Sequence, residues 1–400
     1  MTRISFIMPT FNRADYIAQS LDAVLAQMSA DDELVVVDDG SSDGTAEVVK
    51  PYLDRLRYLR QENAGKSVAL NRAMEATDGE YVWICDDDDL LRPGVVERMV
   101  SEIESAGVDM VFGRYTRFRM ENGARVEMGA GYWPNLGRGS VARHILEDAF
   151  VMHNASLVRR SAYERLGPFD PRMLRSQDYE MFVRLALKAT IRFVDTVVFD
   201  QRKHEGARGP AAVKHAASAS DNVWQTYDAM IFDGFTRDVP LSFFEAMFAA
   251  DAPELSTRAA LLQRGTILAR HGLWDAALAD FEASVKVAPD TALSREEMDI
   301  LWRAVAGKHG FAGLLEDGPF TRLQALKGSP FGREILREVT DGLVWALRSE
   351  EPQVRADARA FLKRAGWGGP VWRWVQRRVG LDRTLPEIVT EVREIPPLPA

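Results

Sequence analysis

The 400-residue sequence predicts an α/β domain with a mostly parallel sheet flanked by helices, followed by an all-α domain. Apolar, β-branched runs alternate with patterns of helical spacing up to residue 106, and each pair is joined by a polar turn. From Ala216 onward, alanine-rich helical patterns dominate without a clear strand. Strands that alternate with helices of this length imply right-handed crossovers, and therefore parallel pairing.

The elements follow from apolar runs that end in turn residues. Strands are expected at 4–8, 34–37, 57–60 and 81–85, and helices at 15–28, 46–53, 68–76 and 93–106. Pro93 stands in the first turn of the last of these helices, where proline is tolerated. Ligands of such sheets bind outside the carboxyl ends of the strands. The residues that follow these strands are therefore the candidate site.

The change from alternating strand and helix patterns to alanine-rich helical patterns predicts two domains, at 1–215 and 216–400. In the second, residues 258–291 resemble one tetratricopeptide repeat, with Gly265, Ala277, Phe281 and Pro289 at the positions of small, large and helix-ending residues. Because stacked repeats need about three units for stability, an amphipathic helical hairpin packed on its own domain explains the pattern equally well. The alternative to such a packed hairpin is a repeat-type peptide groove, through which the helical domain would bind a protein partner.

Composition limits the class of protein. A net charge of −9 argues against broad nucleic-acid binding, which depends on clustered Lys and Arg. The single cysteine, Cys85, excludes an internal disulfide and a cysteine-based zinc cluster and fits a reducing compartment. No run approaches the roughly 20 apolar residues of a membrane span, and the N-terminus lacks a signal peptide pattern. The expected location is therefore the cytoplasm.

The strongest local signal is the acidic run from Asp86 to Asp89, directly after an apolar strand. Adjacent carboxylates repel one another unless a cation or solvent screens them, and hard oxygen ligands suit Mg²⁺ or Mn²⁺. The alternative is a solvated acidic turn. The other metal and nucleotide motifs fail: a calcium loop from Asp39 would need Glu at Lys50, a phosphate loop would need glycine at Arg60, and no G-x-G-x-x-G follows a strand.

The motifs together resemble the family 2 glycosyltransferases of the GT-A fold, over residues 3–210. The resemblance is carried by I-M-P-T-F-N-R at 7–13, V-V-D-D-G-S-S-D-G-T at 36–45, N-A-G-K-S-V-A-L-N at 63–71 and D-D-D-D at 86–89. Further on stand L-V-R-R at 157–160, R-L-G-P-F-D at 165–170, S-Q-D-Y-E-M-F-V-R-L at 176–185 and R-K-H-E-G at 202–206.

The resemblance implies a role for each matching position. Donor-binding residues are expected at Pro9, Thr10 and Phe11 in the base pocket, Asp39 on the base, Asp86 and Asp87 at the ribose and metal, and Arg202 and His204 over the phosphates. Asp88 is expected as the principal metal ligand, together with Asp86, and Asp178 as the catalytic base.

The sequence departs from the family pattern at two positions. Leu70 stands where the family often has Arg, so Lys66 or Arg72 is expected to supply that charge, and Gln177 precedes Asp178 where Glu is common. By spacing alone, without the resemblance, the favoured interpretation of Asp178 is an ordinary aspartate at a helix N-terminus, stabilised by the helix dipole. His153 and Asn154 either lie near the acceptor or are structural.

The resemblance implies an inverting, metal-dependent hexosyltransferase that moves a sugar from a nucleotide-diphosphate sugar, a UDP-sugar being favoured. The expected acceptor is a glycan or lipid-linked glycan in surface polysaccharide synthesis. A nucleotidyltransferase and an inactive adaptor working through the helical domain are the alternatives.

The tail at 363–378 carries five cations and three tryptophans without an acid. This composition is typical of peripheral contact with an anionic membrane, here at its inner face, or of a helix that packs on its domain.

Overall fold

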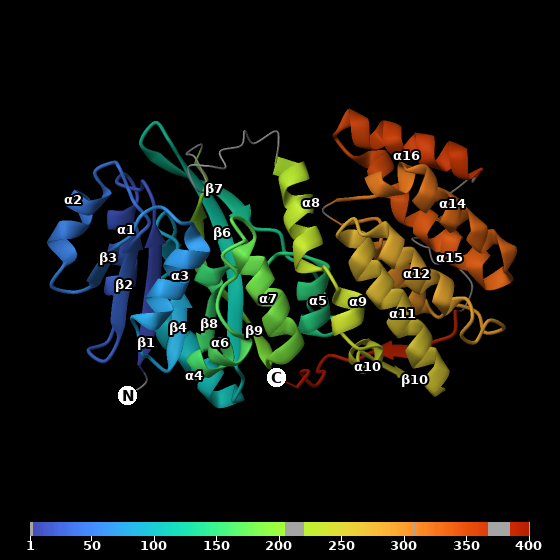
Figure 1. The fold of residues 1–400 in the computed structure, drawn as a ribbon, viewed down its shortest axis with the longest axis horizontal. Coiled ribbons are helices and arrows are strands. Elements are labelled where there is room, and N and C mark those ends of the chain that lie inside the picture. The colour runs from blue at the N-terminus through green and yellow to red at the C-terminus, as the bar shows by residue number, and fades with distance from the viewer. Residues whose placement is uncertain (1–2, 205–219, 308, 367–384, 400) are drawn as a thin grey trace. The chain divides into compact units, whose positions relative to one another are not determined.

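The computed structural model describes residues 3–204, 220–307, 309–366 and 385–399 (Figure 1). The chain divides into two compact units. The sheet unit comprises Met1–Asn135, Ala149–Ser220 and Pro397–Ala400, and the helical unit comprises Leu136–Asp148 and Asp221–Pro396. The domain boundary expected near residue 215 lies outside the described residues. The segment Leu136–Asp148, which the sequence analysis includes in the first domain, groups with the helical unit.

The sheet unit is built on a nine-stranded sheet in the order β3-β2-β1-β4-β8-β6-β9-β5, with β7 paired to β6. Its elements are β1 (Ile4–Thr10), α1 (Ile17–Leu25), β2 (Glu33–Asp38), α2 (Thr45–Val49), β3 (Arg57–Arg60), α3 (Lys66–Glu75), β4 (Tyr81–Ile84), β5 (Leu90–Leu91), α4 (Val95–Ala106), β6 (Met110–Glu121), β7 (Ala124–Ala130), β8 (Ser156–Arg159), α6 (Arg160–Leu166), α7 (Gln177–Lys188) and β9 (Ile191–Arg202). This confirms the expected GT-A-like arrangement of a mostly parallel sheet flanked by helices.

Strand pairing explains why the polar residues gather at one edge. β1 pairs in parallel with both β2 and β4, and β2 pairs in parallel with β3. Every residue of β1 is buried, because helices cover both faces of a parallel sheet. The carboxyl ends of β1, β2 and β4 therefore lie side by side, and the chain leaves each of them into a polar loop. The antiparallel β8, between β4 and β6, separates this parallel half from the β6–β9 pair.

The helical unit consists mainly of packed helices. Its elements are α5 (Val141–Glu147), α8 (Ser220–Ile231), α9 (Phe235–Asp238), α10 (Leu241–Glu245), β10 (Phe248–Ala250), α11 (Pro253–Arg270), α12 (Trp274–Ser284), α13 (Arg295–Arg303), α14 (Asp317–Ala325), α15 (Pro330–Asp341), α16 (Pro352–Ala365) and β11 (Val389–Glu391). The antiparallel pair of β10 and β11 was not expected from the sequence, because strands of three residues are too short to show alternation. None of the described helices is long and apolar enough to cross a membrane.

The predicted hairpin at 258–291 is present as the packed helices α11 and α12 (Figure 1). A Cβ atom at Gly265 would lie 2.7 Å from the Phe281 ring and 3.0 Å from the Ala277 carbonyl oxygen. Only glycine allows this close approach of the two helices. The small and large residues of the repeat-like pattern therefore face one another across the hairpin.

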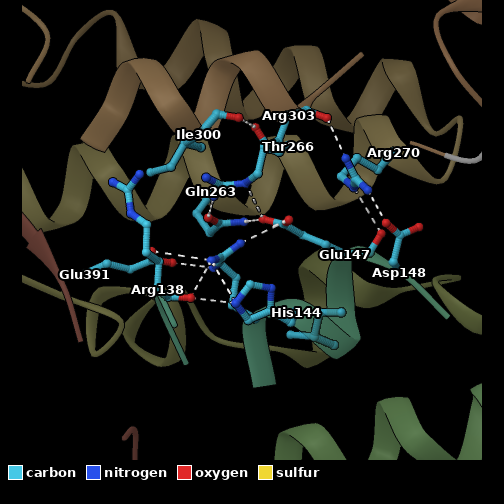
Figure 2. Close-up of polar contacts among 12 residues, drawn as sticks. Arg138, His144, Glu147, Asp148, Gln263, Thr266, Arg270, Ile300, Arg303 and Glu391 are labelled. Carbon is cyan, nitrogen blue, oxygen red and sulfur yellow. Dashed lines mark hydrogen bonds and ion pairs between the residues drawn. The ribbon is translucent and has the colours of Figure 1, made fainter. Parts of the chain in front are cut away.

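Buried ionic contacts hold the segment Leu136–Asp148 in the helical unit (Figure 2). The Glu147 carboxylate accepts hydrogen bonds from Gln263 at 2.9 Å, from Arg303 at 3.0 Å and from Arg143 at 3.1 Å. Arg270 donates to the Glu147 carbonyl at 3.1 Å. Burial alone would raise the pKa of Glu147, but the guanidinium groups of Arg303, Arg143 and Arg270 hold it well below its usual range.

This cluster predicts a pH-dependent loss of stability in the variant Glu147→Gln. Near neutral pH, we expect the variant to be destabilised by about 3 kcal/mol, because buried guanidinium groups lose their anionic partner. Because the pKa of Glu147 is depressed in the folded chain, its contribution is complete above the ordinary value of 4.5 and is lost as the pH falls below it. Denaturant unfolding at pH 7 and pH 4 should therefore show a smaller difference from wild type at pH 4. An equal difference at both pH values, or an equal effect of Glu350→Gln at an exposed position, would contradict the assignment.

Candidate active site

The acidic run lies where the sequence predicts it, directly after β4. Lys66, the first residue of α3, forms an ion pair with Asp86. Burial by itself would lower the pKa of Lys66, but the carboxylates of Asp86, Asp178 and Asp87 together raise it. The ammonium group is therefore surrounded by negative charge from two distant parts of the chain, and it brings the acidic run and α7 into one site.

Asp87 and Asp88 face cationic side chains from other elements. The Arg13 Nε atom lies 3.4 Å from an Asp87 oxygen and 3.6 Å from an Asp88 oxygen. His204 Nε2 lies 2.9 Å from Asp88 Oδ2. Burial and the neighbouring Asp88 raise the pKa of Asp87, against the effect of Arg13. The carboxylates are thus crowded enough for charge repulsion to matter.

Asp89 differs from its three neighbours in being a structural residue. Its Oδ1 atom accepts a hydrogen bond from the Arg202 backbone N–H at 2.8 Å, and Oδ2 accepts one from the Asn154 side chain at 2.8 Å. Asn154 also accepts a hydrogen bond from the Asp86 N–H and, through its carbonyl, from the Trp83 indole at 3.0 Å. Asn154 and Asp89 therefore fix the acidic loop to β9 and to the turn that precedes β8.

Asp178 lies in the first turn of α7, partly exposed, and accepts a hydrogen bond from the Tyr179 N–H at 2.8 Å. Its negative charge acts to raise the pKa of both Lys66 and His153. The neighbouring acid Glu180 is instead held by Arg184 at 2.7 Å, and Arg184 also donates to the carbonyls of residues 166–168. Of the two acids, Asp178 is the one that faces the site.

Two side chains of α3 hold the segment that precedes α7. The Ser67 hydroxyl donates to the Met173 carbonyl at 3.0 Å. The Asn71 side chain and the Phe169 backbone exchange two hydrogen bonds, each of 2.8 Å. The last asparagine of the third motif thus clamps the R-L-G-P-F-D segment rather than entering the site. Of the two cations proposed to replace the family arginine, Lys66 contacts the acidic run, whereas Arg72 donates to the Arg60 carbonyl.

Asp39 organises the loop after β3. Its carboxylate accepts hydrogen bonds from Gln61 and the Ala64 N–H at 2.8 Å, from the Gly65 N–H at 2.8 Å and from Asn63 at 3.0 Å. These four bonds use the acceptor positions of both oxygens. Beside this loop is an open hollow of about 580 Å³, lined by Gly40, Arg60, Gln61, Glu62 and Asn63.

The remaining predicted donor residues lie around the same edge. Pro9 and Thr10 end β1, and the half-buried Phe11 follows them directly. Arg202 is buried: its Nε atom donates to the Asp88 carbonyl at 2.9 Å, and its guanidinium group lies over the Tyr16 ring at 5.2 Å. The structure therefore places Arg202 as a support of the acidic loop and His204 at its surface side, on Asp88.

The sequence analysis assigned no role to Arg13 and Gln61, and it left Asn154 either near the acceptor or structural. All three side chains contact predicted site residues, and only Arg13 lies inside a quoted motif. His153 is buried, and neither ring nitrogen has a hydrogen-bond partner among the residues that the structure describes; burial and Lys66 lower its pKa to about 4. These residues reach the site through contacts with residues far away in the chain, and the local spacing of residue types does not reveal such contacts.

The donor set fits a divalent cation. Asp86 and Asp88 offer hard carboxylate oxygens, the ligands that Mg²⁺ and Mn²⁺ prefer. Burial and, after it, the neighbouring Asp88 carboxylate raise the pKa of Asp87, and a bound cation would offset the repulsion between these carboxylates.

Residues 5–167 match the family model described as Glycosyl transferase family 2. This part of the chain therefore resembles a family 2 glycosyl transferase domain. An uncharacterised glycosyltransferase of Rickettsia felis is 26% identical over 243 residues, covering 56% of this chain and 38% of that protein. Glycosyltransferase GlyA of Streptococcus pneumoniae is 34% identical over 124 residues, covering 30% of this chain and 18% of GlyA. Chondroitin synthase of Pasteurella multocida is 27% identical over 206 residues, covering 50% of this chain and 20% of that protein. The chain thus covers less than two fifths of each of these relatives.

Two solved structures resemble the chain at low sequence identity. Residues 1–349 of Staphylococcus aureus TarS, in complex with UDP-GlcNAc, are 17% identical and align over 98% of this chain and 100% of that one, with a TM-score of 0.49. The mannosyltransferase PcManGT of Pyrobaculum calidifontis, in complex with GDP-Man and Mn²⁺, is 18% identical over 94% of this chain and 84% of that one, with a TM-score of 0.40.

Proposed function

We propose that the chain is an inverting, metal-dependent glycosyltransferase that moves a sugar from a nucleotide-diphosphate sugar, with UDP-sugars favoured, to a hydroxyl acceptor. The observation that carries the proposal is the meeting of Lys66, Asp86 and Asp178 at the carboxyl end of β4. This edge is where parallel sheets bind ligands, and one site there combines a cation for phosphate, carboxylates for a metal, and an acid on a separate helix.

The proposed donor site uses the polar loops that follow β1, β2, β3 and β4. The hollow beside Asp39 would hold the base, in contact with the Gln61–Asn63 loop, because Asp39 keeps that loop in place. Lys66 and Arg13 are the nearby cations that would face the diphosphate. Asp86 and Asp88 would hold the divalent metal, which stabilises the negative charge of the departing diphosphate when bound.

In the proposed reaction, the acceptor hydroxyl oxygen attacks the anomeric carbon of the donor. The bond from this carbon to the diphosphate oxygen breaks, and its electron pair leaves with the nucleoside diphosphate. Asp178 takes the proton of the hydroxyl, so a single displacement inverts the anomeric configuration. α7 supplies the rigid element that would aim Asp178, and the hydrogen bonds from α3 to the segment before α7 would keep the base at a fixed place relative to Lys66.

The acceptor is proposed as a glycan or lipid-linked glycan of surface polysaccharide synthesis. Two relatives carry the names chondroitin synthase and hyaluronan synthase, which refer to the assembly of glycan chains. Cytoplasmic location and a protein partner of the helical unit remain proposals that rest on the sequence alone.

Product analysis tests this function against a nucleotidyltransferase. Incubation of the chain with a UDP-sugar, Mn²⁺ and candidate glycans should release UDP and form a glycoside of inverted anomeric configuration. Release of pyrophosphate instead would show nucleotidyl transfer, and a retained anomeric configuration would contradict the single displacement.

The proposed membrane contact is the tail at 363–378, of which residues 367–378 lie outside the described part of the chain. Within the described part of the tail, Arg364 donates to the Leu315 carbonyl at 2.9 Å and lies 3.9 Å from the Phe320 ring centroid, so it packs on the helical unit. Deleting the whole C-terminus would also remove β11, so charge removal at Arg373, Arg377 and Arg378 is the cleaner test. We expect this triple Gln variant to co-sediment less with anionic liposomes at low salt, by about 1 kcal/mol per cation, and equal co-sedimentation would contradict membrane contact.

A further inference from the structure

Three potential metal ligands converge in the helical unit, outside the proposed transferase site. They are Asp228 on α8, His271 directly after α11, and His309 in the loop after α13. The ligand atoms all lie within 4.8 Å of one another. His271 Nδ1 lies 3.0 Å and His309 Nε2 lies 2.7 Å from the same oxygen, Asp228 Oδ2. Asp228 and His271 are 1% and 3% exposed, so the cluster is built into the interior of the unit.

The second nitrogen of His271 determines which atom faces Asp228. Nε2 lies 2.9 Å from the Leu146 carbonyl oxygen, which can only accept a hydrogen bond, so Nε2 carries a proton. A neutral ring then presents the lone pair of Nδ1 to the Asp228 carboxylate. Two acceptors at this distance need either an additional proton or a cation between them. A ring N–H donated to a backbone carbonyl is also the usual outer-shell contact of a metal-bound histidine.

Neighbouring groups hold the ligands in this arrangement. The Phe232 ring stacks on His271 with 4.0 Å between centroids and an interplanar angle of 20°. A Cβ atom at Gly307 would lie 2.8 Å from the Cα atom of Arg270, so only glycine lets the loop that carries His309 approach the end of α11 so closely. The positions of His309 and His271 are thus fixed by packing from both sides.

We propose that Asp228, His271 and His309 form a binding site for a transition-metal dication, with Zn²⁺ as the best match. Two imidazole nitrogens and one carboxylate oxygen are a common donor set for Zn²⁺, whereas Mg²⁺ and Ca²⁺ prefer oxygen ligands alone. The ion joins α8, the end of α11 and the loop after α13, which are distant in sequence. The site is independent of the proposed transferase reaction, and its metal class differs from the Mn²⁺ or Mg²⁺ expected at Asp86 and Asp88.

Zinc titration of the full chain, stripped with a chelator, tests the site. Competition against a chromophoric chelator should show one tight Zn²⁺ per chain, and Co²⁺ should give the visible absorption of a site with nitrogen ligands. Asp228→Asn keeps the size of the side chain, and its amide N–H can donate to the Nδ1 lone pair of His271, but it removes the anionic ligand. We expect it to weaken Zn²⁺ binding at least about 100-fold, since loss of even an outer-shell partner costs about 10- to 100-fold.

Two further variants separate this site from the acidic run and from misfolding. Asp88→Asn, in the sheet unit, should leave the tight Zn²⁺ site unchanged. His309→Gln removes a ligand from a loop, and we expect it to weaken Zn²⁺ binding by the same order even if Asp228→Asn fails to fold. Absence of tight Zn²⁺ binding by the wild-type chain, equal affinity in His309→Gln, or loss of the tight site in Asp88→Asn would each overturn the proposal and leave a protonated histidine as the partner of Asp228.

Discussion

Replacing Asp178 with asparagine is expected to reduce sugar transfer at least about 100-fold while the affinity for donor and metal is unchanged. Asparagine keeps the size of the side chain and its hydrogen bond from the Tyr179 N–H, but it cannot take the proton of the acceptor hydroxyl. Initial rates with a saturating donor and the true acceptor, together with calorimetry of donor binding, measure the two effects separately.

The matched control is Glu180→Gln, two residues further along α7. Because Glu180 is paired with Arg184 and held toward residues 166–168, we expect its variant to keep most of the transfer activity. If Asp178 were only a helix-terminal charge, its asparagine variant would lose about 1 kcal/mol of stability and little turnover. A variant of Asp178 that retains more than about a tenth of wild-type transfer would place the base elsewhere.

Asp88→Asn is expected to abolish the metal-dependent part of donor binding and to leave the fold intact. The Asp88 carboxylate lies among Asp87, Arg13 and His204, so its removal weakens a cation site and also relieves repulsion from Asp87. Calorimetry with UDP, in the presence and absence of Mn²⁺, measures this effect.

The control for this variant is Asp78→Asn, which removes an exposed carboxylate before the amino end of β4. It carries the same change of charge at the opposite end of the strand from the acidic run, so we expect wild-type affinity for UDP and Mn²⁺. An affinity in Asp88→Asn equal to that of wild type would show that Asp88 is not a metal ligand.

Much of the sheet unit could be predicted from the sequence because its signals are local. A buried run such as Ile4–Thr10 predicts a strand by composition, and the parallel pairing follows from the helices between the strands. The acidic run could be placed at the carboxyl end of β4 because it directly follows an apolar run that predicts a strand.

The remaining features depend on contacts between residues far apart in the chain. Asn154 reaches Asp89 across 65 positions, and no local pattern distinguishes it from an ordinary surface amide. The four hydrogen bonds to Asp39 come from a loop whose conformation spacing does not determine. The grouping of Leu136–Asp148 with the helical unit depends on buried arginines such as Arg143 and Arg270, which composition alone predicts to be exposed.

Thermal unfolding with nucleoside diphosphates tests the central claim, that the edge after β4 binds a nucleotide through carboxylates and a divalent metal. A ligand at 100 times its Kd stabilises the folded chain by about 2.7 kcal/mol, which is large enough to measure as a rise in Tm. We predict that at least one of UDP, GDP, ADP and CDP raises the Tm of the wild-type chain in a concentration-dependent manner with Mn²⁺, and that Asp88→Asn removes this rise. No rise with any of the four, or an equal rise in Asp88→Asn, would contradict the account.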